Sequence, residues 1–242
     1  MPPSVCKSLQ QSLAARQMWT RRGGPGTGFS TGPERWGTQQ SCGVRVLNRR
    51  LLFREWFLNL PLESMEKGAR NLLITGEPGI GKSTLAMKLV EELKALHPVG
   101  FYTDEIRVDG TRKGFQVISL DGRRSHLAHV DCRSPLIIGK YRVNVWAFEK
   151  FLDEIDLTGS DGRIVIIDEI GKMECMSRYF RMVVEELLEQ ERIVIATVAQ
   201  NGTGMIETVK QREDVILFEM MRRNREEMLG KVLRSVQKIR FS

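Results

Sequence analysis

The sequence predicts an α/β protein: a mostly parallel sheet, helices on both of its faces, and a β-hairpin insertion. Fully apolar segments such as Ile164–Ile167 and Ile193–Val198 alternate with segments of helical periodicity, a pattern typical of parallel strands buried between helices. The dipeptide Asp109-Gly110 separates two strand-like runs and favours a tight hairpin turn. The chain has 242 residues, of which 41% are hydrophobic, and this is enough for one such domain.

The predicted elements run in order from residue 71 to residue 236. Asn71–Thr75 is short and apolar, as expected for a buried strand. In Lys82–Leu96, leucines recur at the spacing of one helix face. The hairpin strands are expected at Val99–Val108 and Lys113–Leu120, and because the hairpin interrupts the alternation we place it at a sheet edge. The other expected elements are the strands Tyr141–Val145, Ile164–Ile167, Ile193–Val198 and Val215–Phe218 and the helices Trp146–Ile155, Met176–Gln190 and Arg222–Val236.

Residues 1–64 differ in composition from the rest, and we predict a poorly structured N-terminal extension followed by one domain at 65–242. No acid precedes Glu34, and residues 21–37 are rich in Gly, Pro and Thr. Three interpretations of the extension stay open: an organelle transit peptide, a short basic amphipathic helix at 45–60 that touches a membrane or a partner, or a start assigned too early, with Met65 as the natural one.

The net charge of +7 comes almost entirely from this N-terminal part. Ten of the 37 Lys and Arg residues but only four of the 30 Asp and Glu residues lie in 1–68, which leaves 27 and 26 for 69–242. A nearly neutral domain offers no electrostatic basis for binding nucleic acid. The four cysteines include no C-x-x-C pair, which excludes a zinc knuckle and favours a reducing compartment. No run approaches the roughly 18 apolar residues of a membrane helix, so we expect no membrane span and take a cytoplasmic location as the default.

The segment GEPGIGKS at 76–83 matches the phosphate-loop (P-loop) pattern G-x-x-x-x-G-K-[ST] at every position. Glycines let the backbone curl until its N–H groups point at phosphate oxygens, and a following helix adds the positive end of its dipole. The pattern implies that Lys82 reaches the β- and γ-phosphates, that the Ser83 hydroxyl ligates Mg²⁺, and that Thr84 contacts the α-phosphate. The predicted phosphate-binding residues are Gly76, Glu77, Pro78, Gly79, Ile80, Gly81, Lys82, Ser83 and Thr84.

A P-loop needs an acid at the end of a buried strand to help hold the metal. The apolar run Ile164–Ile167 is followed by Asp168 and Glu169. We expect Asp168 to hold Mg²⁺ with Ser83, and Glu169 to polarise an attacking water as general base. Two adjacent acids fit the division of P-loop proteins in which a glutamate beside the metal-binding aspartate drives hydrolysis.

Other polar residues near these motifs are weaker candidates. Asp168 to Gly171 also fits the D-x-x-G switch of GTPases, but no guanine-reading N-K-x-D follows, so a switch GTPase is not expected. Thr197 and Gln200-Asn201 follow the next strand, where a polar side chain commonly senses the γ-phosphate, although Asn201-Gly202 equally suits a turn. The candidates for an arginine that stabilises transition-state charge are Arg212, Arg222, Arg223 and Arg225.

These segments together resemble the small P-loop nucleoside-triphosphatase family of thermophilic prokaryotes, which has a vertebrate cancer-related member. The resemblance covers about residues 69–236, and DEIGKME at 168–174 is its most specific segment. It is carried by NLLITGEPGIGKSTL at 71–85, GFYTDEIR at 100–107, RKGFQVISLDG at 112–122, IDEIGKMEC at 167–175 and the pair Asn224-Arg225.

The resemblance implies a P-loop NTPase fold and hydrolysis of several nucleoside triphosphates (ATP, GTP, CTP, UTP) to diphosphate and phosphate, with Mg²⁺ and loose base preference. It maps one nucleotide-binding stretch onto Gly76–Ser83. The other stretch comprises Ile164, Val165, Ile166, Ile167, Asp168, Glu169, Ile170 and Gly171.

Two other functions stay open at this point. A nucleotide or small-metabolite kinase would need an acceptor pocket and a lid, which the insertion from Phe101 to Val145 could supply; an added acceptor would then divert the γ-phosphate from water. An NTP-dependent binding module would show little turnover without its partner. The partners expected are nucleoside triphosphates, with nucleic acid not expected and a monomer favoured.

Overall fold

The computed structural model describes residues 68–159 and 163–240. The chain divides into two units, residues 1–48 and 49–242, and all the described residues belong to the second. The extension predicted at residues 1–64 therefore lies outside the described residues.

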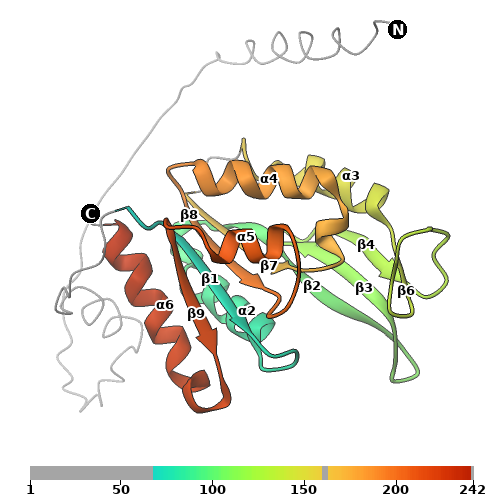
Figure 1. Ribbon diagram of the computed structural model, residues 1–242, viewed down its shortest axis with the longest axis horizontal. Helices are drawn as coiled ribbons and strands as arrows, with labels where there is room; N and C mark the ends of the chain where they lie inside the picture. Colours follow the sequence, from blue (N-terminus) through green and yellow to red (C-terminus); the bar gives the residue numbers. More distant parts are fainter. Residues whose placement is uncertain (1–67, 160–162, 241–242) are drawn as a thin grey trace, which may run out of the picture. The chain divides into compact units, whose positions relative to one another are not determined.

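The described part is built on one nine-stranded sheet (Figure 1). Its strands are β1 (Asn71–Gly76), β2 (Val99–Val108), β3 (Thr111–Ser119), β4 (Arg124–His129), β5 (Ile137–Ile138), β6 (Tyr141–Val143), β7 (Ile164–Ile170), β8 (Ile193–Val198) and β9 (Val215–Met220). They lie in the order β5-β6-β4-β3-β2-β7-β8-β1-β9. Neighbours from β2 to β9 are parallel, whereas those from β5 to β2 are antiparallel. The sheet thus has a parallel half and an antiparallel extension.

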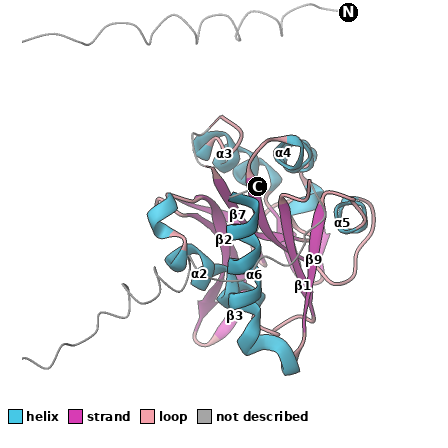
Figure 2. Ribbon diagram, turned by 90° about the vertical axis from the view of Figure 1, so that its left-hand side faces the viewer, coloured by secondary structure: helices cyan, strands magenta, loops and turns pink. Residues whose placement is uncertain are grey.

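Helices cover both faces of the parallel half, as the sequence predicts. They are α2 (Lys82–Glu92), α3 (Val145–Ile155), α4 (Arg178–Glu189), α5 (Met205–Lys210) and α6 (Arg225–Arg240), with short 3₁₀ turns at Lys94–Leu96, Glu174–Met176 and Arg222–Asn224. Helices α2 and α6 lie on one face, and α3, α4 and α5 lie on the other (Figure 2).

The alternation of side chains along each parallel strand builds two separate cores. In β7, Ile164 and Ile166 pack toward α2 and α6, whereas Val165 and Ile167 pack toward α3 and α4. On the second face Phe101 is in edge contact with Phe148 and Phe180, with ring centroids 5.9 and 6.2 Å apart. Each such aromatic pair adds about 0.5–1.5 kcal/mol beyond its buried area. This packing fixes β2 and β7 beside each other, and the site depends on that pairing.

Gly100 allows β2 to lie close against β7. A Cβ atom at Gly100 would stand 1.8 Å from the carbonyl oxygen of Ile166, and the φ of Gly100 is +141°. A side chain would therefore force the two strands apart, so this position requires glycine.

The element bounds correct several predictions. The helix expected at Lys82–Leu96 ends at Glu92 and is followed by a 3₁₀ turn. The helices expected at Met176–Gln190 and Arg222–Val236 begin at Arg178 and Arg225, each after a 3₁₀ turn. The hairpin is confirmed, with Asp109 and Gly110 both at positive φ. Its first strand, however, is a member of the parallel half rather than a part of the edge insertion. The strands β4 and β5 and the helix α5 were not predicted.

Within the described residues, no helix is both long enough and apolar enough to cross a membrane.

Candidate active site

The phosphate loop joins β1 to α2, as the motif predicts. Gly81 immediately precedes α2 and has a φ of 110°, a left-handed conformation that favours glycine. Next to it, the buried Lys82 donates a hydrogen bond from Nζ to the carbonyl oxygen of Gly76 at 3.0 Å. The lysine side chain therefore folds back over its own loop, and its ammonium group lies where the loop curls.

The carboxylates predicted as partners of the loop lie beside it. Lys82 Nζ is 3.7 Å from Glu169 Oε2. Asp168 is almost completely buried, and its Oδ1 accepts a hydrogen bond from the Thr197 hydroxyl at 2.5 Å. The Ser83 hydroxyl lies near enough to lower the pKa of this carboxyl group. Lysine, serine, aspartate and glutamate of the two motifs thus form one cluster at the carboxyl ends of β1 and β7.

Asp168 and Glu169 lie within a strand and not after it. Sequence reasoning ends the strand at Ile167, whereas β7 continues to Ile170 and contains both Asp168 and Glu169. Its neighbour β2 pairs Tyr102 with Asp168, and the Thr103 hydroxyl donates to the backbone oxygen of Asp168 at 2.8 Å. The acids are therefore held by the sheet rather than by a loop.

Burial raises the pKa values of the three carboxyl groups at this site. For Asp168 the largest effect is desolvation, opposed by the hydrogen bonds from Thr197 and Ser83 and by the charge of Lys82. Desolvation also raises the pKa of Glu169, again opposed by Lys82. Glu174 is buried, and desolvation raises its pKa to about 8. Lys82 thus favours the charged forms of the two catalytic candidates, whereas Glu174 is mainly neutral at pH 7.

A cavity of about 650 Å³ gathers these residues. Of the predicted residues, it is lined by Pro78, Gly79, Gly81, Lys82, Ser83, Thr84, Asp168, Glu169, Gln200 and Asn201. It is also lined by residues to which sequence reasoning assigned no role, among them Thr103, Lys172 and Glu174. Glu174 belongs to the DEIGKME segment, so that segment was the available signal for it. Thr103 belongs to the GFYTDEIR segment of the resemblance, but its contact with Asp168 follows only from the pairing of β2 with β7.

Only part of the second predicted nucleotide-binding stretch, residues 164–171, lies at the cavity. The side chains of Ile164, Val165, Ile166 and Ile167 lie in the two cores, and Ile164 is at the end of β7 remote from the phosphate loop. Only Asp168 and Glu169 of this stretch line the cavity.

A smaller cavity of about 470 Å³ lies on the other side of the phosphate loop. It is lined by Glu77, Pro78, Gly79, Ile80, Arg222, Arg225 and Glu226. The Arg225 guanidinium packs on the loop, since a Cβ at Gly81 would be 3.3–3.4 Å from its atoms. Of the four arginine candidates, Arg222 and Arg225 therefore stand beside the loop. Arg212 instead pairs with Asp214 and Glu189, near the start of β1, so its candidacy is wrong.

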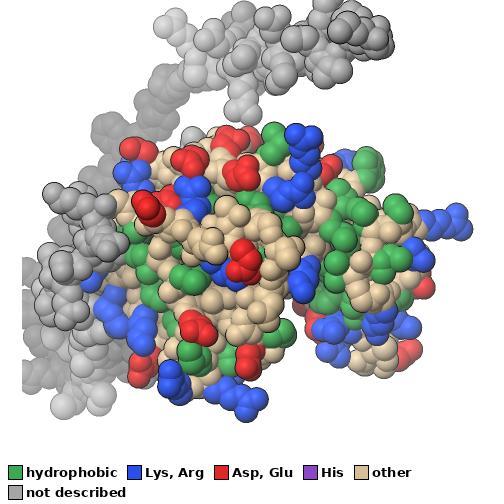
Figure 3. Space-filling view, viewed as in Figure 1, with side chains coloured by type: hydrophobic (Ala, Val, Ile, Leu, Met, Phe, Trp, Pro, Cys, Tyr) green, Lys and Arg blue, Asp and Glu red, His purple; other side chains and the backbone are tan. Residues whose placement is uncertain are grey.

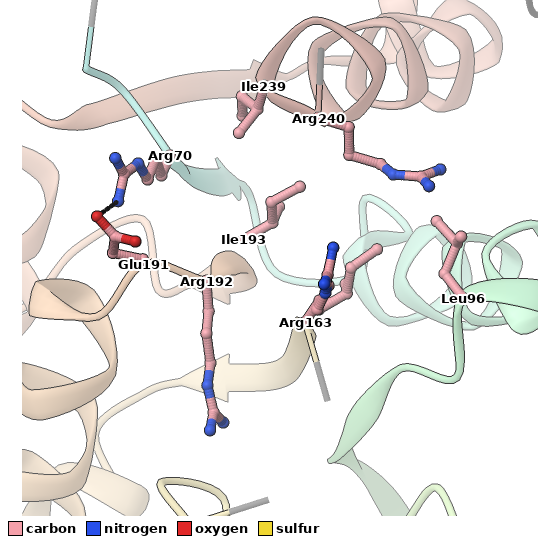
Figure 4. A pocket seen from close by; sticks show the side chains of 9 residues that line it. Arg70, Leu96, Arg163, Glu191, Arg192, Ile193, Ile239 and Arg240 are labelled. Atoms are coloured by element: carbon pink, nitrogen blue, oxygen red, sulfur yellow. Dashed lines mark ion pairs between the residues drawn. The ribbon is translucent and has the colours of Figure 1, made fainter. Parts of the chain in front are cut away.

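A third cavity, of about 320 Å³, lies at the opposite edge of the sheet, where β7 and β8 begin (Figure 4). Arg70, Arg163, Arg192 and Arg240 line it. Among its described lining residues the one carboxylate is that of Glu191, which stands 3.5 Å from Arg70. Because the phosphate loop and both catalytic acids are at the other ends of the strands, this cavity is not part of the site.

A family model described as NTPase matches residues 71–233. The chain belongs to this NTPase family. The match begins at β1 and ends within α6, so the family's domain includes the phosphate loop, the acids and the antiparallel extension.

Relatives of the chain in this NTPase family come from bacteria and from animals. It is 42% identical over 163 residues to nucleoside-triphosphatase THEP1 of Thermotoga maritima, covering 67% of this chain and 92% of that protein. It is 36% identical over 188 residues to the human cancer-related nucleoside-triphosphatase, covering 71% and 99%. The crystal structure of THEP1 from Aquifex aeolicus matches with a TM-score of 0.62 and 32% identity, covering 69% of this chain and 98% of that one. The fold is thus the P-loop NTPase fold that the sequence predicts.

Proposed function

We propose that this chain hydrolyses nucleoside triphosphates to the diphosphate and phosphate in a Mg²⁺-dependent reaction with broad base preference. The observation that carries the proposal is the cluster of Lys82, Asp168 and Glu169 over a complete phosphate loop. Membership of the NTPase family and relatives named nucleoside-triphosphatases support the same activity.

The residues at the site fit a magnesium ion. Asp168 Oδ2 is buried and has no hydrogen-bond partner among the described residues, and a buried carboxylate oxygen without a partner is costly. Together with the Ser83 hydroxyl it offers the hard oxygen ligands that Mg²⁺ takes beside the phosphates of a nucleotide. Ser83 and Asp168 would hold the ion, which when bound neutralises charge on the β- and γ-phosphates.

The chain's own residues account for the rest of the reaction. The loop N–H groups and Lys82 bind and orient the phosphates, so the γ-phosphorus is presented toward Glu169. Glu169 would accept a proton from a water that attacks this phosphorus, and the ammonium group of Lys82 would balance charge on the departing diphosphate. Thr197 and Thr103 hold Asp168 by its Oδ1 and its backbone oxygen, which fixes the neighbouring Glu169 in place.

The broad base preference finds support in the cavity beside Arg225. A guanidinium plane can stack on any base, because every base has a π-face. The described lining of this cavity comes from the loop, from the 3₁₀ turn before α6 and from the first turn of α6, and it includes no N-K-x-D segment. We therefore assign the nucleoside to this side of the loop and the γ-phosphate to the side of Glu169.

Phosphate release by the full chain tests this proposal. With Mg²⁺, we expect ATP, GTP, CTP and UTP to be hydrolysed at comparable rates, and chelation of the metal should stop all four reactions. A single accepted base would contradict the broad preference. Turnover that survives chelation would contradict the role of the metal.

The nucleoside assignment has its own test. Arg225→Ala should raise the KM for all four triphosphates about 10-fold, since stacking on a base is worth roughly 1–3 kcal/mol. It should leave the KM for tripolyphosphate, which has no base, little changed. An equal effect on tripolyphosphate would place Arg225 on the phosphates instead. Arg223→Ala, in the 3₁₀ turn just before α6 and outside the described cavity lining, is the matched control.

A further inference from the structure

The cavity at the active site extends well past the phosphate loop. We use the word chamber for its part under the antiparallel extension, which is lined by Asp104, Glu105, Phe115, Leu127, Ile138 and Met173. These residues come from β2, β3, β4 and β5 and from the segment after β7. Figure 3 shows apolar side chains gathered on the end of the molecule that β3, β4 and β6 form, with a groove between this end and the parallel half. Because the proposed function assigns the nucleoside to the Arg225 side of the loop, the bound triphosphate would not occupy the chamber.

The apolar wall of the chamber is built and braced. Phe115, Ile138 and Met173 pack partly buried against a small core of Ala128, Tyr141 and Val143. The rings of Phe115 and Tyr141 meet edge to face with centroids 5.1 Å apart. Behind them the Arg112 guanidinium lies 5.2 Å from the Phe115 ring centroid and donates to the Tyr141 hydroxyl at 2.9 Å. An apolar wall held in place with a few polar groups at its edge is typical of a small-molecule site.

The charges around the chamber exclude a strongly anionic occupant. Hydrogen bonds from Arg112 and Arg107 keep the pKa of Glu105 low, so Glu105 is ionised and these two guanidinium groups are engaged with it. Asp104 adds a second exposed carboxylate. Beyond the phosphate loop, Lys172 is the one basic side chain in the described lining. A phosphate dianion would meet more negative than positive charge there.

We propose that the chamber is a second small-molecule site, which binds an uncharged alcohol with a flat body, of the nucleoside class, beside the γ-phosphate of the bound triphosphate. The flat body would lie against Phe115, Ile138 and Met173. Its hydroxyl and amino groups would meet Asp104, Glu105 and Lys172 at the edge. The inference rests on the proposed function for the position of the γ-phosphate.

An occupant would compete with the attacking water. The chamber opens onto Glu169, so a hydroxyl group there stands where water reaches the γ-phosphorus. If the hydroxyl attacks, its oxygen forms a bond to the γ-phosphorus while the bond from that phosphorus to the bridging oxygen of the diphosphate breaks. Its proton passes to the Glu169 carboxylate, and a phosphate monoester and a nucleoside diphosphate result. Phosphate release falls in both cases: when the bound alcohol accepts the phosphoryl group, and when it only blocks the attacking water.

The experiment adds adenosine, guanosine, cytidine or uridine to the full chain turning over Mg-ATP and follows phosphate release together with phosphorylated nucleoside. We expect at least one nucleoside to lower phosphate release with saturation, with or without formation of the monoester. Ile138→Trp, which fills the chamber, should raise the half-saturating nucleoside concentration at least about 10-fold, the scale of a misfit in an apolar pocket. Ile137→Trp is the matched control, because Ile137 is on the same short strand, is 49% exposed and does not line the chamber.

Four other results would contradict either the second site or the proposed function. If hydrolysis proceeds and none of the four nucleosides lowers phosphate release, the second site is wrong while the proposed function stands. If Ile137→Trp and Ile138→Trp act alike, the site is not the chamber. If nucleoside monophosphates act at lower concentrations than nucleosides, the uncharged class is wrong. If ATP is not hydrolysed at all, the proposed function fails first.

Discussion

The two halves of the sheet differ in how they are built and in what they hold. In the parallel half, β1, β7 and β8 are buried on both faces. Near their carboxyl ends Thr197 donates a hydrogen bond to Asp168, and Lys82 Nζ lies 3.7 Å from Glu169. In the antiparallel extension, β3 to β6 are partly exposed and hold an apolar wall with a salt-bridged rim. The first arrangement fixes polar atoms for chemistry, whereas the second shapes a space for a second molecule.

The comparison teaches that different halves of the sheet carry the two roles. The parallel half holds the catalytic groups, and the antiparallel extension determines which second molecule can bind. The catalytic groups rest on strands whose backbone groups are paired and whose side chains are packed, so their positions are closely determined. Within the sheet, the extension joins the parallel half through the pairing of β2 with β3. Changes in the parallel half should therefore alter hydrolysis, and changes in the extension should alter what else binds. The following predictions test the first part of this division, from the largest expected effect to the smallest.

Lys82→Ala should lower phosphate release by at least about 10³-fold, because positive charge on the transferring phosphoryl group is worth 10³–10⁵ in rate. Nucleotide binding should weaken as well, since Lys82 holds the phosphates. Lys88→Ala, at an exposed position of the same helix, is the control and should behave as the unmodified chain. If the activity of Lys82→Ala were within tenfold of that of the unmodified chain, Lys82 and its phosphate loop would not be the catalytic site.

Asp168→Asn should lower turnover on the order of 10²–10³-fold and raise the half-saturating Mg²⁺ concentration. The amide keeps an oxygen that can accept from Thr197 but loses the negative charge at the site where Oδ2 has no partner. A Mg²⁺ titration of phosphate release measures both effects. An unchanged Mg²⁺ dependence would mean that the ion is held elsewhere.

Thr197→Val should cost about 10- to 100-fold in activity, the usual effect of removing a group that orients a metal ligand. Valine has the shape of threonine but no hydroxyl to donate to Asp168. A rise in the half-saturating Mg²⁺ concentration would separate this role from a purely structural one. A variant with normal kinetics and lowered thermal stability would show that the contact only supports folding.

Glu174→Gln should change stability more than activity, and in a pH-dependent way. The pKa of Glu174 is raised to about 8 in the folded chain, so the folded chain holds a proton that the unfolded chain loses near pH 4.5. Stability should therefore fall as the pH rises from about 5 to 8, by up to about 1.4 kcal/mol per unit. Glutamine stays neutral, so this variant should have a flatter profile and a higher Tm at pH 8.

Thermal unfolding at pH 5, 6.5 and 8 measures the difference. Glu185→Gln, at an exposed position of α4, is the control. A variant with Glu174→Gln that is less stable than the unmodified chain at pH 8 would contradict a mainly neutral Glu174.

The parallel half could be predicted from sequence because its signals are local. An apolar run such as Ile193–Val198 is a strand with the predicted bounds, and the glycine, lysine and serine of the loop stand in consecutive positions. The acids were found because they follow the apolar run Ile164–Ile167, although they lie within β7 itself. The sequence does not show which strands lie side by side in the sheet. Thr103 on β2 was therefore missed, although its hydroxyl donates a hydrogen bond to the backbone oxygen of Asp168 on β7.

The extension was harder to predict because its elements are short and mixed in polarity. The strand β4, RSHLAH, lacks regular alternation, and β5 has two residues. The helix α5 has six residues, too few for helical periodicity to be recognised. The wall of the chamber also requires the packing of Phe115 against Tyr141, residues 26 positions apart along the chain on strands that do not pair directly.

The central claim is that Glu169, on the parallel half, activates the water that attacks the γ-phosphorus. The most direct measurement mixes the full chain with Mg-ATP in a single turnover and identifies the nucleotide that stays bound, for the unmodified chain and for Glu169→Gln. We predict that the unmodified chain converts the bound ATP to ADP, whereas Glu169→Gln retains intact ATP and hydrolyses it about 10²–10⁴-fold more slowly. Rapid appearance of bound ADP in Glu169→Gln would contradict the account.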